Sequence, residues 1–462
     1  MKMEIEIISK EKIKPSSPTP SHLKTFKLCL LDQLIPAPYA PIILFYDPIT
    51  TITTTKRLDL LKASLSEALT EFYPLAGKLK EDNLSIECND EGADFFESRI
   101  NYFSLHEFLS QPDLFDSMLH HFLPSNITNT SCTSVLTNIQ VNVFKCGGIA
   151  IGICISHKLL DGAALCTFLK SWTAIARRSS PCISPNLFAA ASLFPAEDLW
   201  LRDSAIDMWC SLFRKGNEPS VTKRLVFDAS AIATLKLEAQ TAQKKPPTSV
   251  EVASAFIWQC CMAASEEKHG LQRPSLLTHV VNLRTKILSL MNGPDLDLKY
   301  STGNLLWLAA TRSNAGDNDD DHEQQSRLPG LVSELREALS KVDSYFVNNK
   351  LRGEKGRSVI FESIKELKNS DGVDLDHYGF SSWCKLGWYE AADFGWGKPV
   401  WMSSIGSNSA PHFMNLIILV DTKSGDGIEA WVTLEQHQMA LLEANSSLQK
   451  LVSVDPSPLI IN

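Results

Sequence analysis

The chain has 462 residues, of which 44% are apolar and 21% are charged, a composition typical of a protein that folds throughout its length. At about 150 residues per domain, this length predicts two or three domains. Lysine and arginine number 44 against 53 acidic residues, and the resulting net charge of −9 argues against a protein that binds nucleic-acid phosphates.

The cysteines, the N-terminus and the longest apolar segment together indicate the cellular compartment of the protein. The 11 cysteines are odd in number, scattered, and include no C-x-x-C pair, so neither a disulfide framework nor a zinc site is expected. The N-terminus alternates charged residues with isoleucine and lacks the apolar core of a secretory signal. The longest apolar run, GGIAIGICI, is about half of the ~20 residues that a spanning helix needs. We therefore expect a cytoplasmic enzyme that holds no metal and has no membrane or nucleic-acid partner.

The first half of the chain predicts a helix, a hairpin and a second helix. Residues 58–72 place leucine and alanine at three- and four-residue steps, which is typical of an amphipathic helix. Residues 139–155 alternate, turn at Gly147 and Gly148, and continue as an apolar run, which predicts a β-hairpin with a buried second strand. Residues 162–178 predict another helix with one apolar face.

Residues 179–217 contain several prolines and no sustained period, so we interpret them as the linker between two halves. The second half then predicts a strand at 223–227, a helix at 249–264 and a hairpin at 416–434. An acidic segment at 314–325 predicts an exposed loop. Strands and helices in both halves favour an α/β or α+β fold class.

The segment SHKLLDG, from Ser156 to Gly162, is the most specific local motif. A histidine at the end of a buried strand can act as a general base, because its ordinary pKa lies near neutrality. The alternative for His157 is a hydrogen-bonded core histidine. Asp161 is either a triad partner of His157 or the N-cap and ion-pair residue of the following helix, and the spacing leaves both open.

A second motif, DFGWGKP, runs from Asp393 to Pro399 and predicts a tight loop with an aromatic anchor, which alone is most often structural. A dinucleotide loop is excluded because Val400 stands where the third glycine belongs. A nucleophile elbow is excluded at 406–410, where Asn408 replaces the serine.

Together, these two motifs resemble the H-x-x-x-D and D-F-G-W-G signatures of the plant BAHD acyl-CoA-dependent acyltransferases. They occur here in the family's order, far apart in the chain. H-x-x-x-D-G alone is shared with other coenzyme A-dependent acyltransferases and with condensation domains, which carry a second histidine where this chain has Ser156. Further segments similar to the family are LLDQL at 30–34, FYPLAGKL at 72–79, VNLR at 281–284, TGN at 302–304 and GIEAWVTL at 427–434.

The resemblance implies an α/β fold of two chloramphenicol-acetyltransferase-like domains. Each domain would be a mixed sheet covered by helices, with a solvent channel between the two. The first domain would cover residues 1–205 plus a returning segment near 390–416 and would carry H-x-x-x-D. The second would cover 206–462, carry VNLR and contribute to the coenzyme A side, and the linker at 179–217 would be the crossover between them.

The resemblance also implies the chemistry. His157 would be the general base that takes the proton of an alcohol as its oxygen attacks the thioester, without an acyl-enzyme. Asp161, followed by Gly162, would be structural and would pair with Arg284 of VNLR. Trp383 matches a family tryptophan whose indole N–H holds the oxyanion; a core tryptophan is the alternative.

Two further groups of residues take roles from the resemblance. Asp393 would be catalytic or, with Gly395 and Gly397, would organise the site from outside the channel. Coenzyme A would bind at the start of the helix near residue 249, where a helix N-terminus suits a phosphate. A solvated lysine pair and an ordinary helix cap are the alternative for these residues, which are Lys244, Lys245, Thr248 and Ser249.

Within the family, the segments HKLLDG, VNLR and TGN are more similar to the vinorine synthase and alcohol acetyltransferase branch than to the hydroxycinnamoyl or anthocyanin branches. Acetyl-CoA is therefore the expected co-substrate, and the acceptor would be a hydroxyl of an alkaloid, a terpenoid or a small alcohol. The family likeness suggests a monomer without a permanently bound cofactor. A catalytically silent binding protein and a thioesterase-like hydrolase are the alternatives.

Overall fold

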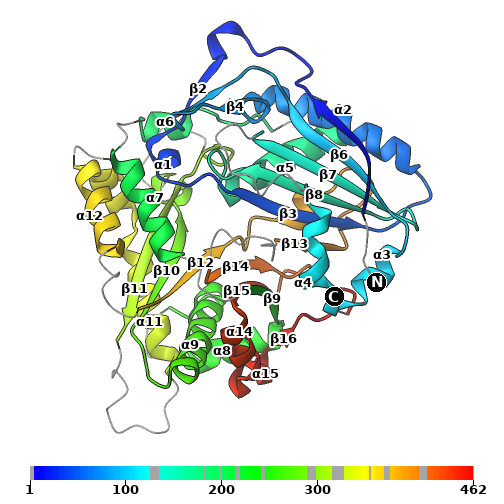
Figure 1. Cartoon of the computed structure of the whole chain (residues 1–462). Helices are drawn as coiled ribbons and strands as arrows, with labels where there is room; N and C mark the ends of the chain where they lie inside the picture. Colours follow the sequence, from blue (N-terminus) through cyan, green and yellow to red (C-terminus); the bar gives the residue numbers. More distant parts are fainter. Residues whose placement is uncertain are drawn as a thin grey trace.

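The computed structural model describes residues 5–124, 135–179, 183–196, 200–213, 219–240, 245–288, 298–314, 327–352, 355–368, 375–404 and 414–460. Two large mixed sheets form its framework, one in each half of the molecule (Figure 1). Each sheet has helices packed against it, so the predicted mixed α/β fold is confirmed. Most of the acidic segment 314–325 and all of 406–410 lie outside the described residues.

The first sheet has six strands. They follow the order β1 (Glu6–Ile13), β6 (Ala93–Ile100), β7 (Thr137–Phe144), β8 (Ile149–Ser156), β3 (Tyr39–Tyr46) and β13 (Trp401–Ser403). The pair β6–β7 is parallel and the other pairs are antiparallel. The short strand β13 therefore returns from far along the chain to the edge beside β3.

The hairpin predicted at 139–155 is present as β7 and β8, and its turn is closed by a hydrogen bond from Phe144 N–H to the Gly148 carbonyl at 2.9 Å. Every residue of β8 is buried, as its apolar run predicts. The polar side chains of β7 are buried as well, because Gln140 and Asn142 donate to the carbonyls of His121 and Phe122 in the turn that covers this face. The alternation of polar and apolar residues in β7 therefore does not mean that the polar face of this strand is exposed to solvent.

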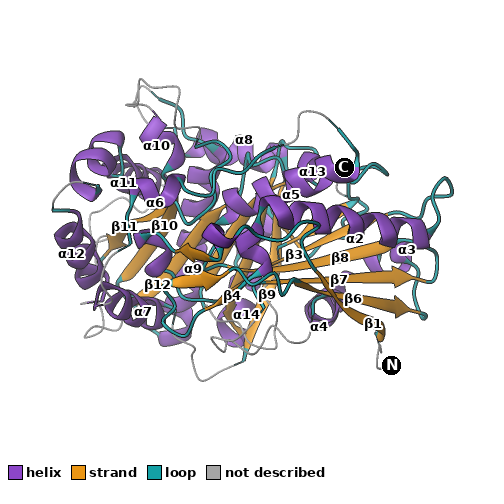
Figure 2. Ribbon diagram, turned by 90° about the horizontal axis from the view of Figure 1, so that it is seen from above, coloured by secondary structure: helices purple, strands orange, loops and turns teal. Residues whose placement is uncertain are grey.

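Helices α2 (Thr54–Glu71) and α5 (Gly162–Ala176) cover the other face of the first sheet and pack on each other (Figure 2). Helix α2 begins at the N-cap Thr53 and ends before Pro74, and Leu61, Leu65 and Leu69 are buried along one face. Helix α2 confirms the amphipathic period of its sequence, whereas α5 forms where it was predicted but is buried on nearly all sides, with Thr167, Ser171 and Thr173 buried as well. Shorter elements of this half are α1 (Leu30–Gln33), α3 (Leu105–Leu109), α4 (Phe115–Met118), α13 (Trp388–Ala391), and a small sheet of β2 (Thr25–Lys27), β4 (Lys78–Leu79) and β5 (Ser85–Glu87).

The second sheet has seven strands. They follow the order β11 (Leu306–Ser313), β10 (Ser275–Asn282), β12 (Asp376–Ser382), β14 (Leu416–Asp421), β15 (Ile428–Glu435), β9 (Ser220–Phe227) and β16 (Ser453–Val454). The pairs β10–β12 and β12–β14 are parallel and the others are antiparallel. The strand predicted at 223–227 and the hairpin predicted at 416–434 are both present.

Helices of the second half include the long α9 (Ser249–His269), which extends the helix predicted at 249–264 to a left-handed Gly270. Its neighbours are α8 (Ala229–Glu238), α11 (Leu328–Lys341) and α14 (Gln436–Ala444). The remaining α-helices of the described residues are α6 (Ala189–Leu193), α7 (Trp200–Leu212), α10 (Arg284–Leu288), α12 (Gly356–Lys368) and α15 (Ser446–Leu451). Each helix among the described residues is too short or too polar to cross a bilayer.

The described part of the predicted linker 179–217 contains helices α6 and α7, so the lack of a sustained period in its sequence does not mean irregular structure, and its role as the linker stays a prediction. Helix α7 forms within it and packs against α12 (Figure 1). The buried residues Leu201, Ala205, Met208 and Leu212 recur at helical spacing, so an apolar face exists that the surrounding prolines obscured. The domain limits drawn at residues 205 and 206 remain a prediction.

Candidate active site

His157 lies directly after β8, where the first sheet ends. Its backbone N–H donates to the Pro38 carbonyl at 2.8 Å, which fixes the chain beside the start of β3. His157 as a whole is partly exposed, unlike the fully buried strand that precedes it. This exposure is compatible with a general base, and that role of His157 stays a prediction.

The side-chain partner of His157 is Asn304, from the segment that precedes β11 of the second sheet. The Asn304 Oδ1 atom lies 3.0 Å from His157 Nδ1, and Asn304 Nδ2 donates to the His157 carbonyl at 2.9 Å. Asp161 makes no hydrogen bond to this ring among the contacts of the described residues. The triad interpretation of Asp161 is therefore wrong for this structure.

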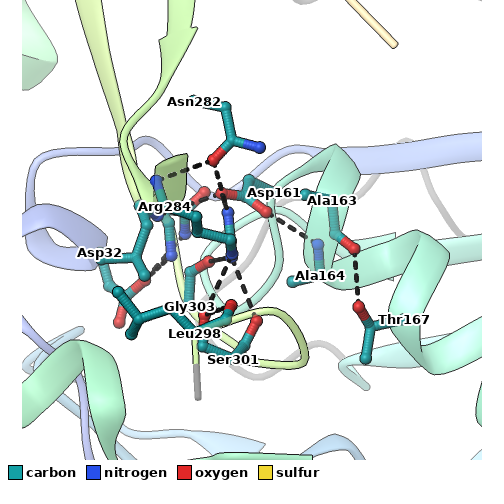
Figure 3. Close-up of polar contacts among 12 residues, drawn as sticks. Asp32, Asp161, Ala163, Ala164, Thr167, Asn282, Arg284, Leu298, Ser301 and Gly303 are labelled. Carbon is teal, nitrogen blue, oxygen red and sulfur yellow. Dashed lines mark hydrogen bonds and ion pairs between the residues drawn. The ribbon is translucent and has the colours of Figure 1, made fainter. Parts of the chain in front are cut away.

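Asp161 instead caps α5 and pairs with Arg284 (Figure 3). Its Oδ1 accepts from Ala164 N–H at 2.9 Å, and its Oδ2 lies 2.7 Å from Arg284 Nη1. The N-cap and the ion pair that the sequence allowed are thus both present in one carboxylate. Both side chains are buried, with 8% and 6% of their surface exposed, so little solvent screens the pair.

Arg284 also holds the segment that carries Asn304. Its guanidinium donates to Ser301 Oγ at 3.0 Å, to the Ser301 carbonyl at 3.2 Å and to the Gly303 carbonyl at 3.0 Å (Figure 3). Arg284 follows β10 in the second sheet, whereas Asp161 follows β8 in the first. The ion pair therefore joins the loop of His157 to the loop of Asn304.

Gly162 and Trp383 make close contact at the start of α5. A Cβ atom on Gly162 would lie 2.8 Å from Trp383 Nε1, so a residue with a side chain would displace the indole. Trp383 is 8% exposed and stacks on Trp388 with ring centroids 5.0 Å apart. The structure thus places the indole N–H beside the H-x-x-x-D loop, and the oxyanion role of Trp383 stays a prediction.

The D-F-G-W-G loop lies far from His157. Asp393 Oδ1 accepts from the N–H groups of Gly395 at 2.8 Å and Gly397 at 3.1 Å, and both glycines have positive φ, 101° and 107°. Tyr46 donates to the neighbouring Ala392 carbonyl at 2.6 Å.

Strand β3 spans the distance between this loop and His157. Its last residue, Tyr46, contacts the loop, and its first residue, Tyr39, pairs with Ser156, which precedes His157. At about 3.3 Å per residue, the two ends of β3 are roughly 20 Å apart. Asp393 is therefore too distant from His157 to contact the reacting atoms, which corrects the prediction that Asp393 is catalytic. The organising alternative fits the geometry, because the carboxylate holds the loop.

The residues predicted to bind coenzyme A lie at the N-terminus of α9, apart from Lys244, which lies outside the described residues. Thr248 is the N-cap: its Oγ1 accepts from Glu251 N–H at 3.2 Å, and Glu251 in turn accepts from Thr248 N–H at 2.8 Å. Ser249 is the first helical residue, and the exposed Lys245 accepts a hydrogen bond from Arg336 through its carbonyl. The capping interpretation accounts for Thr248, and the coenzyme contacts stay a prediction.

Two buried charged residues next to the site were not assigned from the sequence. Asp32 is 2% exposed, and burial raises its pKa although hydrogen bonds from Cys29 and Asn304 lower it. Lys158 is 2% exposed; burial lowers its pKa to about 8, and its Nζ donates to the carbonyls of Gln33 and Ile35. Asp32 and Asn304 fall in the segments LLDQL and TGN, but their contact joins residues too distant in sequence for a pattern to reveal.

An apolar pocket lies between α1, α7, β11 and α12. Its cavity volume is about 60 Å³, and Ser363 adds one hydroxyl to a lining of aliphatic, methionine and tryptophan side chains. In this lining Leu31 directly precedes Asp32, Leu34 follows it by two residues, and Leu306 follows Asn304 by two residues. In the described ranges, no group of three or more histidine, cysteine or acidic side chains is arranged to hold a metal ion.

These features define a two-sheet acyltransferase with a histidine where the sheets meet, and comparison with known proteins agrees. The family model named Transferase family matches residues 3–449, so the chain belongs to this family, the BAHD acyl-CoA-dependent acyltransferases. The chain is 42% identical to limonoid 7-O-acetyltransferase of Citrus sinensis, covering 99% of this chain and 100% of the relative. It is 35% identical to salutaridinol 7-O-acetyltransferase of Papaver somniferum, with 96% and 97% covered. The crystal structure of vinorine synthase is similar with a TM-score of 0.77 and 31% identity, over 98% of this chain and 100% of that one.

Proposed function

We propose that the protein transfers an acetyl group from acetyl-CoA to a hydroxyl of an apolar, ring-containing plant metabolite, a terpenoid or an alkaloid. The observation that carries the proposal is the partly exposed residue His157, whose imidazole is held through Nδ1 by Asn304 so that Nε2 faces away from this contact. The names of the relatives support an acetyl donor and an O-linked acceptor.

The reaction proceeds by direct transfer. As the alcohol oxygen attacks the thioester carbonyl carbon, His157 Nε2 accepts the hydroxyl proton. The tetrahedral intermediate then breaks its carbon–sulfur bond, and the imidazolium returns the proton to the departing thiolate. The products are the acetyl ester and coenzyme A, and no covalent bond to the protein forms.

Two further groups serve this reaction. The Trp383 indole N–H, beside the H-x-x-x-D loop, stabilises the oxyanion, a contribution of about 3 kcal/mol for one donor. Lys245, Thr248 and Ser249 bind the coenzyme A phosphates at the N-terminus of α9. The channel that admits both substrates runs between the two domains, whose limits we place at residues 1–205 with the return near 390–416, and at 206–462.

The apolar pocket holds the ring skeleton of the acceptor. Its lining is suited to a hydrocarbon framework, and it adjoins Asp32 and Asn304 in the chain. Replacing Met208 by tryptophan fills the pocket, and we expect the KM for the acceptor to rise about tenfold or more while the KM for acetyl-CoA stays the same. Leu237→Trp, at a position 71% exposed on α8, is the matched control. An unchanged acceptor KM in Met208→Trp would remove the pocket from the proposal.

The experiment that tests the function is a panel of acyl-CoA donors and alcohols, read by mass spectrometry and by release of free thiol. We expect an acetylated alcohol and one thiol per ester. Thiol release without an acceptor favours a thioesterase, and no release with any pair favours a silent binding protein. Light scattering tests our further proposal of a monomer, and a fluorescent fusion in plant cells tests the cytoplasmic location.

A further inference from the structure

Asp32 is connected to His157 through one intervening side chain. The Asp32 Oδ1 atom accepts from Asn304 Nδ2 at 2.9 Å and from the Asn304 backbone N–H at 2.7 Å. Asn304 is fully buried and Asp32 is 2% exposed, so water does not compete for these bonds. The Asn304 Oδ1 atom, at the other end of the same amide, faces His157 Nδ1.

The orientation of the Asn304 amide follows from this network. Its Nδ2 group faces two acceptors, the Asp32 carboxylate and the His157 carbonyl, and an amide turned over would place its oxygen against both. The amide oxygen must therefore face the imidazole. An oxygen can only accept, so Nδ1 of His157 carries the proton and Nε2 has the free lone pair.

Asp32 is itself held from several sides. Its Oδ2 accepts from Cys29 N–H at 3.0 Å, which closes the capping box of α1. Gly303 has φ of +89°, and a Cβ there would lie 3.5 Å from Asp32 Oδ1 and only 2.8 Å from Ala190, so its missing side chain lets this segment approach. Lys158 binds the carbonyls of Gln33 and Ile35 and places a buried positive charge near the carboxylate.

We propose that Asp32 is a positioning residue of the acyl transfer, which acts through Asn304 to hold His157 in the tautomer with its proton on Nδ1. The inference rests on the proposed function, because it assigns Nε2 as the atom that accepts the alcohol proton. Asp32 contacts neither substrate in this account. Its carboxylate fixes the orientation of the Asn304 amide, and the amide oxygen in turn stabilises one tautomer of His157.

The test is a double-mutant cycle on Asp32→Asn and Asn304→Ala. We expect kcat to fall about 10- to 100-fold in each single variant, by analogy with the outer partners of metal-binding histidines, with the KM for acetyl-CoA unchanged. Because Asp32 acts through Asn304, the double variant should be no slower than Asn304→Ala alone. Asp94→Asn is the control, since this aspartate is also buried, 3% exposed, but lies on β6.

A second measurement reads the tautomer in the wild-type protein itself. Nitrogen-15 NMR of histidine-labelled wild-type protein, with the His157 signal assigned by its loss in His157→Ala, should show the Nδ1–H tautomer when the ring is neutral. An Nε2–H tautomer there, a wild-type kcat in Asp32→Asn, or fully additive losses in the cycle would each overturn the proposal. Wild-type activity in His157→Ala would instead refute the proposed function, so the two failures are distinguishable.

Discussion

The buried ion pair between Asp161 and Arg284 allows a quantitative test of how the two sheets are joined. In Asp161→Asn the side chain still caps α5, because asparagine is as good an N-cap as aspartate. The Arg284 charge, however, remains buried without its carboxylate. Breaking such a pair from one side costs about 3–5 kcal/mol. For a cooperative unit of roughly 200 residues, 3 kcal/mol lowers the thermal midpoint by about 6–12 °C.

The matched control is Glu67→Gln, which breaks the ion pair of Glu67 with Arg178. That pair has a similar separation, 2.8 Å, but its side chains are 37% and 70% exposed. An exposed pair contributes about 1 kcal/mol or less, so the control should lower the midpoint by at most a few degrees. Thermal unfolding followed by circular dichroism measures both variants. Equal midpoints for the two would contradict the assignment of Asp161–Arg284 as the bond that holds the His157 loop to the second sheet.

Three more changes test other parts of the structure. Gly162→Ala should lower the thermal midpoint and kcat because its Cβ would meet Trp383 Nε1 at 2.8 Å, and adding Trp383→Phe should recover part of the midpoint; no loss in the single variant would contradict this contact. Asp393→Asn should keep more activity than Asp393→Ala, since asparagine retains an acceptor for the loop amides, and equal inactivity would favour a catalytic carboxylate. Burial lowers the pKa of His377 to about 4, so as the pH falls from about 6.5 the unfolded chain binds the proton before the folded protein does. Denaturant titration should therefore show that the free energy of unfolding of the wild-type protein, relative to that of His377→Gln, falls by about 3 kcal/mol by pH 4. A difference that stays constant with pH would contradict this.

Local chemistry in the sequence was enough to predict the hairpin that delivers His157 and the helix that follows it. Both depend on short-range patterns: alternation, a pair of glycines, and a capping aspartate before an apolar stripe. The sequence limited the role of Asp161 to a capping residue or a triad member. Only the position of Arg284, more than a hundred residues away in the chain, decides between these two roles. Long-range pairing is thus where pattern reasoning stops and the fold adds new information.

The features that the sequence did not reveal depend on what covers a side chain. Gln140 and Asn142 sit at alternate positions that predict a solvent-facing side, yet a turn from elsewhere in the chain accepts their hydrogen bonds. Asp32 and Asn304 were part of matched segments, but their relation to His157 appears only once β8, α1 and β11 come together. Helix α7 was missed because the prolines before it outweighed its apolar face.

The account depends most on His157 as the base. The most direct measurement compares His157→Ala with the wild-type protein in single-turnover acetyl transfer, using the alcohol identified in the panel and saturating acetyl-CoA. We predict that the rate falls at least ~100-fold while the thermal midpoint and the KM for acetyl-CoA are unchanged. A variant that transfers acetyl groups at the wild-type rate would contradict the mechanism.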